Sequence, residues 1–237
     1  MGSRRTPDAR VCGSADFAPF GVGTRRVGAS AVHGNLEPML DADALRPETL
    51  RLLTRDEFTR MAAAGVFDDD EHVELLRGVL VAMTKQGEPH ARITAWLGRA
   101  LDRALDDAYE VRQHTSYSAT ADSVPEPDVQ VVARALRRQL PRSAFLLIEV
   151  SETTLRKDQT VKPPIYAENR CPEYWVVDLP NQAVWVHSEP TKQRYKSVVR
   201  FDARDVLRPR LLPGVAIPVA EIPWWPPATK RSRRRAR

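Results

Sequence analysis

The chain has 237 residues, of which 42% are apolar, so it can bury the core of one domain. No run approaches the ~18 consecutive apolar residues of a membrane-spanning helix, and the N-terminus lacks the apolar segment of a secretory signal. The two cysteines, Cys12 and Cys171, are too few for a disulfide framework or a cysteine metal site. We therefore expect a cytoplasmic protein without a membrane partner.

The net charge of +5 comes from the C-terminal end of the chain. Without six basic residues there, the rest of the chain carries −1, which excludes a broadly basic nucleic-acid clamp. The tail can bind phosphates of nucleic acid in a salt-dependent way, or it can serve only as a solubilising end. The six residues are Lys230, Arg231, Arg233, Arg234, Arg235 and Arg237.

Composition divides the chain into three parts. Residues 1–50 are rich in Gly, Ala, Arg and Pro and show no sustained periodicity, so we predict a disordered segment. Residues 51–224 carry the patterns of a folded domain, and residues 225–237 are predicted to form a basic disordered tail.

The first elements of the predicted domain are helical. Thr54 followed three residues later by Glu57 is a capping-box pattern, and the helix is expected to end at Gly65. Residues 72–83 (HVELLRGVLVAM) are interpreted as a short helix or turn followed by a strand. Pro89 opens a long helix whose apolar residues recur at helical spacing as far as Leu105.

Strands dominate the second half of the domain. Residues 109–119 predict a half-exposed strand, whereas 127–133 and 143–150 are more continuously apolar and predict buried central strands. Residues 158–169 are helix-like but interrupted by Pro163 and Pro164. Residues 174–201 predict a meander, and residues 213–222 close the domain. The pattern favours a single α/β or α+β domain.

Four charged residues along the middle of the chain, Glu74, Asp128, Glu149 and Lys162, suggest a metal-dependent hydrolytic site. Asp128 stands in PEPDVQVV, Glu149 ends the apolar run FLLIEV, and Lys162 follows in KDQTVKPPIY. Carboxylates at the ends of neighbouring strands can meet at one edge of a sheet and supply the oxygen ligands that Mg²⁺ prefers. A nearby ammonium group can polarise water or neutralise phosphate charge.

Each of these residues also has a purely structural interpretation. Asp128, preceded by a proline, can be an exposed turn residue at a strand end. Glu149 shares a face with Leu147 by alternation and can form a buried ion pair with Lys162 or Arg156. Lys162 can be a solvated helix residue.

Glu74 and the two supporting candidates, His90 and Asp158, also have alternative interpretations. Glu74 in VELLRGVL can supply a third carboxylate or lie on a helix face. His90, at the start of the long helix, can contact phosphate or support a metal, or it can lie at the surface. Asp158 can be a turn residue, or it can orient Lys162 from one helical turn away.

Taken together, these motifs resemble those of the Uma-type restriction-endonuclease family of the PD-(D/E)xK nuclease superfamily. The resemblance covers about residues 54–222, and its most specific segments are EVSETT and PEYWVVD. It implies a restriction-endonuclease-like core, with a mixed central sheet flanked by helices. Magnesium would be bound by Asp128 and Glu149, with Glu74 contributing from the first helix.

The sequence departs from the superfamily pattern at its lysine. Ser151 occupies the usual lysine position, and in the Uma-type pattern the lysine lies on the following helix, which matches Lys162. Because Pro163 and Pro164 follow directly, either this helix starts near Lys162 or it is kinked.

The expected function is that of an endonuclease that uses Mg²⁺, with Mn²⁺ as a substitute, to hydrolyse phosphodiester bonds, above all in DNA. Nucleases of this superfamily often act as dimers, so a homodimer is compatible with the resemblance. The alternative is a catalytically inactive domain of the same fold that binds nucleic acid or protein.

Overall fold

The computed structural model describes residues 50–68, 71–83, 85–136, 138 and 140–224. The two segments predicted to be disordered lie outside these ranges except for Leu50, and the six basic tail residues lie outside as well. The division of the chain into three parts therefore remains a prediction.

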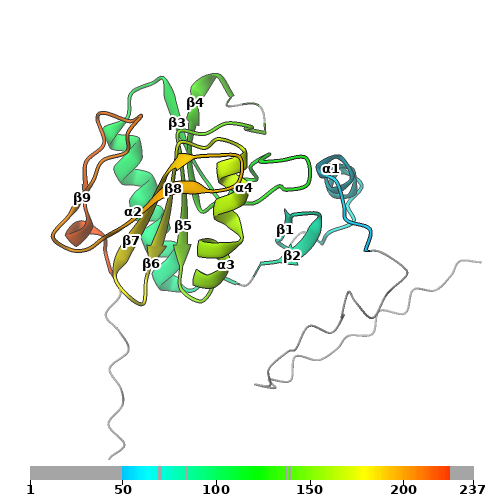
Figure 1. The fold of residues 1–237 in the computed structure, drawn as a ribbon, viewed down its shortest axis with the longest axis horizontal. Helices are drawn as coiled ribbons and strands as arrows, with labels where there is room; N and C mark the ends of the chain where they lie inside the picture. The colour runs from blue at the N-terminus through cyan, green and yellow to red at the C-terminus, as the bar shows by residue number, and fades with distance from the viewer. Residues whose placement is uncertain (1–49, 69–70, 84, 137, 139, 225–237) are drawn as a thin grey trace, which may run out of the picture. The chain divides into compact units, whose positions relative to one another are not determined.

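The described part of the chain contains both helices and strands, with strands prevailing in its second half (Figure 1). The helices are α1 (Arg55–Ala63), α2 (Glu88–Ala104), α3 (Leu155–Thr160) and α4 (Lys162–Glu168), with short 3-10 helices at Arg134–Leu136 and Val219–Glu221. The strands are β1 (Val73–Leu76), β2 (Val79–Ala82), β3 (Tyr109–Gln113), β4 (Val129–Ala133), β5 (Leu146–Ser151), β6 (Glu173–Asp178), β7 (Ala183–Pro190), β8 (Tyr195–Phe201), β9 (Val206–Leu207) and β10 (Ile217–Pro218).

A six-stranded sheet in the order β3-β4-β5-β6-β7-β8 forms the centre of the fold. β5 and β6 are parallel and are connected through α3 and α4, whereas the other neighbouring strands are antiparallel. The predicted α/β (α+β) class with a mixed central sheet flanked by helices is confirmed. The predicted meander is also confirmed, since it forms β6, β7 and β8.

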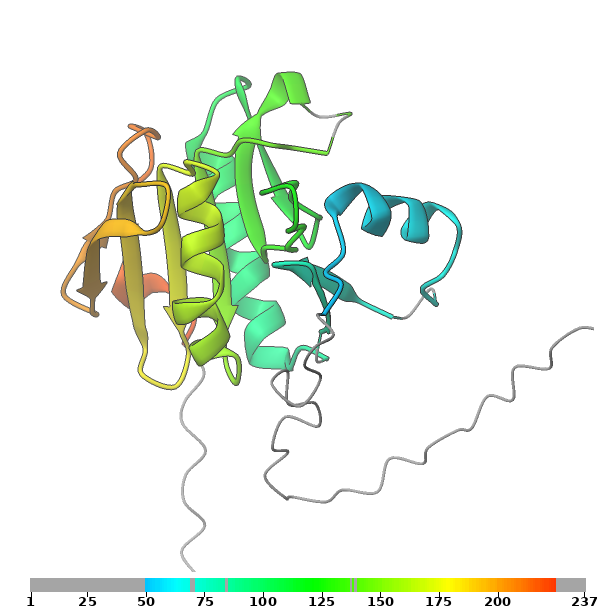
Figure 2. The same ribbon diagram turned by 45° about the vertical axis from the view of Figure 1, so that its right-hand side comes forward.

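The two faces of the sheet carry different helices (Figure 2). On one face, Leu146, Ile148 and Val150 of β5 belong to the same core cluster as the apolar side of α2. On the other, Leu147 belongs to a cluster with residues of α4, and Glu149 contacts Lys162 of α4. Strand alternation therefore presents Glu149 to α4, on the face predicted from its spacing to Leu147.

The predicted starts of the first helices are confirmed. The backbone N–H of Thr54 donates to Glu57 Oε2 (2.9 Å), and the N–H of Glu57 donates to Thr54 Oγ1 (3.2 Å), which completes a capping box before α1. Pro89 lies in the first turn of α2, where its missing N–H leaves no helix hydrogen bond unmade. No described helix combines the length and apolar character needed to cross a membrane.

Residues 73–82 form an antiparallel hairpin, so the predicted strand is present as β2, but the short helix or turn predicted before it was wrong, because β1 lies there. Arg77 and Gly78 both have positive φ angles, 52° and 79°, which is the geometry of a tight two-residue hairpin turn. This turn and the β-branched residues on either side outweigh the helical spacing of the leucines. Glu74 therefore lies on a strand and not on a first helix.

The helix-like stretch before β6 is divided at Val161. α3 ends at Thr160 and α4 begins at Lys162, with both prolines in the first turn of α4. Pro163 and Pro164 have no backbone N–H to donate to the preceding turn, so they can begin a helix but not continue one. The prediction that a helix starts near Lys162 is confirmed.

His187 gives the core a predicted dependence on pH. It is 5% exposed in β7, and burial lowers its pKa from 6.5 to about 4. The unfolded chain binds a proton at this histidine more readily than the folded protein does. The stability that the neutral imidazole contributes is therefore complete above pH 6.5 and is lost as the pH falls towards 4. We expect stability to fall by about 2 kcal/mol between pH 7 and pH 5 from this residue.

Urea unfolding at the two pH values measures this loss. The variant His187→Phe fills the same space without titrating, so its stability should fall by less over the same interval. Equal losses of stability in the two proteins would show that His187 does not cause the loss between pH 7 and pH 5.

Candidate functional site

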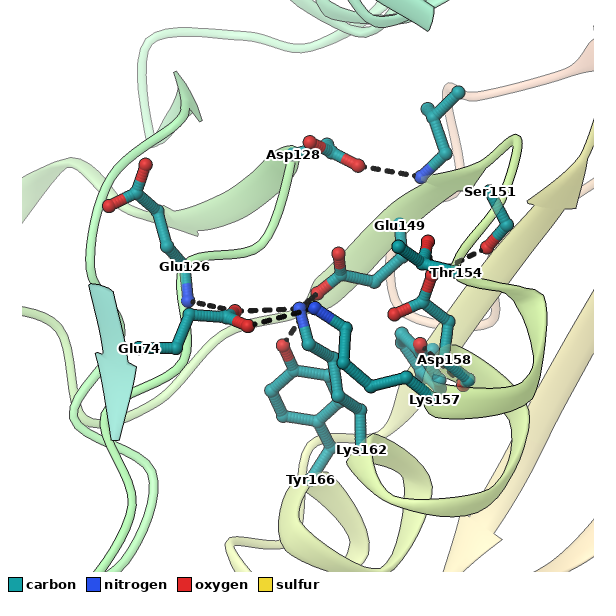
Figure 3. A network of polar contacts seen from close by, with 12 residues as sticks. Glu74, Glu126, Asp128, Glu149, Ser151, Thr154, Lys157, Asp158, Lys162 and Tyr166 are labelled. Atoms are coloured by element: carbon teal, nitrogen blue, oxygen red, sulfur yellow. Dashed lines mark hydrogen bonds and ion pairs between the residues drawn. The ribbon is translucent and has the colours of Figure 1, made fainter. Parts of the chain in front are cut away.

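A small pocket at the end of β5 brings together most of the residues singled out in the sequence. It has a volume of about 50 Å³, enough for a few water-sized groups. Glu74 lies outside its wall but contacts Lys162 from β1 (Figure 3). The predicted residues that line the pocket are His90, Asp128, Glu149, Asp158 and Lys162.

Lys162 is buried between two carboxylates. Only 1% of it is exposed, and its Nζ lies 2.8 Å from Glu149 Oε1 and 2.7 Å from Glu74 Oε1. Burial alone would lower the pKa of Lys162, but the charges of Glu149 and Glu74 outweigh it and raise the pKa above its usual range. The interpretation of Lys162 as a solvated helix residue was therefore wrong, and its ammonium group stays charged.

Glu149 is held at the buried end of β5 through one of its two oxygens. Oε1 accepts hydrogen bonds from Lys162 Nζ and from the Tyr166 hydroxyl, both at 2.8 Å. Oε2 has no hydrogen-bond partner among the described residues. Burial raises the pKa of Glu149 well above its usual range despite the opposing charge of Lys162. The predicted buried ion pair with Lys162 is present, and it leaves one oxygen available.

Glu74 uses both of its oxygens inside the protein. Oε1 accepts from the backbone N–H of Glu126 (2.9 Å) and contacts Lys162, while Oε2 accepts from Lys157 Nζ (3.1 Å). Burial raises the pKa of Glu74, but Lys162 and Lys157 together lower it below its usual value. In this arrangement Glu74 is an ionised partner of two lysines.

Asp128 is 3% exposed, so its predicted exposure at a strand end was wrong. Its Oδ2 accepts from the backbone N–H of Val150 (2.7 Å) and lies 3.0 Å from His90 Nε2. Its Oδ1 accepts from Gln86 Nε2 (3.0 Å). These donors compensate the cost of burying the carboxylate and fix it beside the end of β5. His90 therefore contributes to the site by helping to orient the Asp128 carboxylate.

Asp158 contacts hydroxyl groups and not Lys162. Its Oδ2 accepts from Ser151 Oγ (2.7 Å) and from Thr154 Oγ1 (2.5 Å). Its Oδ1 is buried and has no hydrogen-bond partner within the described residues. Ser151, two residues after Glu149, thus supports another buried carboxylate of the pocket.

The sequence interpretation did not identify Tyr166, Lys157 or Gln86, which all contact site residues. Tyr166 follows Lys162 by four residues on one helix, so helical spacing places it on the same face and could have identified it. Lys157 and Gln86 gave no comparable signal, because their contacts depend on elements that are distant in sequence.

The charges of the site fit a divalent cation. Four buried carboxyl groups lie beside two ammonium groups, so acidic side chains outnumber lysines by two at this site. Among the described residues, no three His, Cys, Asp or Glu side chains are arranged to hold a metal ion. The buried carboxyl groups that line the pocket are Asp128, Glu149 and Asp158, and of these Glu149 and Asp158 each have one oxygen without a hydrogen-bond partner among the described residues. The carboxylates counted here are Glu74, Asp128, Glu149 and Asp158, and the ammonium groups are Lys157 and Lys162.

Two of the three comparisons with known proteins gave a match, and both matches are described as a "putative" nuclease. A family model described as "Uma2: Putative restriction endonuclease" matches residues 55–220. A solved structure from Anabaena variabilis, described as a "putative nuclease belonging to DUF820", has a similar fold with a TM-score of 0.57. It is 12% identical and covers 72% of this chain and 97% of its own. The comparison with curated proteins gave no match.

Proposed function

Because the chain belongs to the Uma2 family, whose model is described as "Putative restriction endonuclease", we propose that it is a metal-dependent endonuclease that hydrolyses phosphodiester bonds in DNA. The observation that carries this proposal is the buried Lys162 ammonium group, held by Glu149 and Glu74 beside Asp128. Burying a lysine together with a surplus of carboxylates costs folding stability, and a reaction site explains why the fold retains it.

Asp128 and Glu149 are the residues that would hold Mg²⁺, with Mn²⁺ as a substitute. Both carboxylates line the pocket, and their oxygens are the hard ligands that these cations prefer. A bound divalent ion supplies polarisation of a phosphoryl oxygen and a more acidic water. Glu74 is less suited as a ligand, because both of its oxygens already contact protein donors.

The other side chains of the site have separate roles in the proposed reaction. The Lys162 ammonium group can hold the attacking water or neutralise charge that develops on the phosphate. Glu74 and Glu149 keep that ammonium group charged and in place. Tyr166 donates to Glu149 Oε1, so the other oxygen of Glu149 is left for the pocket. His90, Gln86 and the Val150 N–H fix the orientation of Asp128.

Cleavage of supercoiled plasmid DNA by the purified full chain tests the proposal. We expect relaxed and linear products with Mg²⁺ or Mn²⁺ and none after chelation with EDTA. The absence of cleavage with either metal, with DNA binding retained, would instead favour the catalytically inactive binding domain.

The contact between His90 and Asp128 predicts a metal-affinity effect. His90→Gln removes the imidazole that lies 3.0 Å from the Asp128 carboxylate, while Val150 and Gln86 still hold that carboxylate. Loss of a group that orients a metal ligand commonly weakens metal binding about 10- to 100-fold. The half-saturating Mg²⁺ concentration for cleavage should rise by that factor, with activity largely restored at high Mg²⁺. An unchanged half-saturating concentration would exclude this role for His90.

A further inference from the structure

A second hollow of about 830 Å³ lies between α1 and the segment around residues 140–142. None of the residues in its wall lines the catalytic pocket. The wall contains three guanidinium groups and one carboxylate, so its net charge is +2. The polar residues of this arginine-lined hollow are Arg55, Asp56, Thr59, Arg60, Ser118 and Arg142.

The backbone around this hollow is held in place by one common loop. The N–H of Arg55 donates to the carbonyl of Ala121 (2.8 Å), which attaches the start of α1 to the loop after β3. The N–H of Ser118, in the same loop, donates to the carbonyl of Pro141 (2.9 Å), next to Arg142. The backbone on the two sides of the hollow is therefore held by hydrogen bonds to the same loop.

The positive charges of the hollow are largely uncompensated. Arg60 and Arg142 form no ion pair within the described residues. The only carboxylate of the described wall, Asp56, lies 3.5 Å from Arg55 Nε and has a side chain that is 84% exposed. Ser118 is 2% exposed, and its Oγ has no hydrogen-bond partner in the part of the chain that the structure describes. Guanidinium groups are well suited to phosphate, because their planar N–H donors match its oxygens.

We propose that the arginine-lined hollow binds backbone phosphates of the nucleic-acid substrate, at a place separate from the catalytic pocket. The inference rests on the proposed function, because it takes a nucleic acid as the substrate. Contacts of this kind carry no base preference and fix the orientation of the polymer on the protein. The rest of the chain without the tail is close to neutral, so the local charge of +2 in the hollow would favour a polyanion at this place.

The test is the salt dependence of duplex DNA binding in EDTA, measured for wild type and for Arg60→Gln/Arg142→Gln. Each lost phosphate contact reduces the slope of log affinity against log salt by about 0.9. Loss of two contacts should make the slope shallower by about 1.8 and weaken binding about 60-fold at about 0.1 M salt. Arg55 is left unchanged in this variant, because it begins α1.

Arg99→Gln/Arg103→Gln is the matched control, because it removes the same charge from exposed positions of α2. A small change in this control beside a large change in the hollow variant would support the proposal. Equal changes in the two variants would overturn it, since general charge alone would then explain the effect.

Titration with inorganic phosphate separates the two sources of a phosphate ligand. If phosphate binds to wild type but not to the hollow variant, while the DNA affinity of both is the same, the hollow binds a free phosphate and the proposal is wrong. Hollow-dependent DNA binding without cleavage would remove the proposed nuclease activity and retain the inference. Cleavage together with DNA binding that does not depend on the hollow would retain the proposed nuclease activity and overturn the inference.

Discussion

Replacement of Glu149 with glutamine should lower metal-dependent cleavage about 10³-fold or more while the domain stays folded. The carboxylate is one of two pocket ligands proposed for the metal, and its Oε2 has no protein partner among the described residues. An amide keeps the shape and can still accept from Lys162 and Tyr166 through its oxygen, but it carries no charge for the cation. Effects of this size are typical when one group that stabilises the transition state is removed.

The matched control is Glu152→Gln, an exposed carboxylate in the wall of the same pocket. We expect its cleavage rate to stay within a few-fold of wild type. Urea unfolding of the Glu149→Gln variant checks that the domain stays folded, as expected if Glu74 still pairs with Lys162. Full Mg²⁺-dependent cleavage by a folded Glu149→Gln protein would refute the assignment of the site.

Lys162→Met should abolish cleavage and also lower the free energy of unfolding by about 3–5 kcal/mol. The lysine is buried, and its removal leaves Glu149 without its ion-pair partner and Glu74 with Lys157 alone. Breaking a buried ion pair by removing one partner commonly costs this much, because an uncompensated charge stays behind. Chemical denaturation of the purified variant at pH 7 measures the loss.

A double variant separates the ion pair from the packing of the side chain. On the Lys162→Met background, Glu149→Gln removes the unpaired carboxylate, so about 1–3 kcal/mol of stability should return although cleavage stays absent. Lys157→Met is the milder control, because Lys157 is partly exposed and Glu74 keeps its contact with Lys162. Independent, additive costs of the two site variants would contradict the pairing.

The sequence predicted elements well where a local signal, such as a cap, a proline or a clear periodicity, was present. The capping box before α1, the proline at the start of α2 and the meander of β6 to β8 all rest on local signals that the fold preserves. The position of Lys162 at the start of a helix was predictable for the same reason, because a proline pair allows few alternatives.

Two features of the site were not predictable because they depend on distant contacts. Glu74 was assigned to a helix, but a turn with two positive φ angles directs its strand towards Lys162. Asp128 was expected at the surface, since the sequence does not show that the Val150 N–H, His90 and Gln86 converge on it. Burial of a polar group is decided by its partners, and these come from three other segments.

The break at Val161 determines how two lysines come to share one carboxylate. In an uninterrupted α-helix, residues five positions apart point in directions that differ by about 140°. Lys157 and Lys162 have this spacing, yet both contact Glu74, and α3 ends and α4 begins between them. The break before the proline pair thus changes the directions in which the side chains of α4 point relative to those of α3. A sequence pattern that requires regular helical spacing around the lysine would therefore overlook this version of the site.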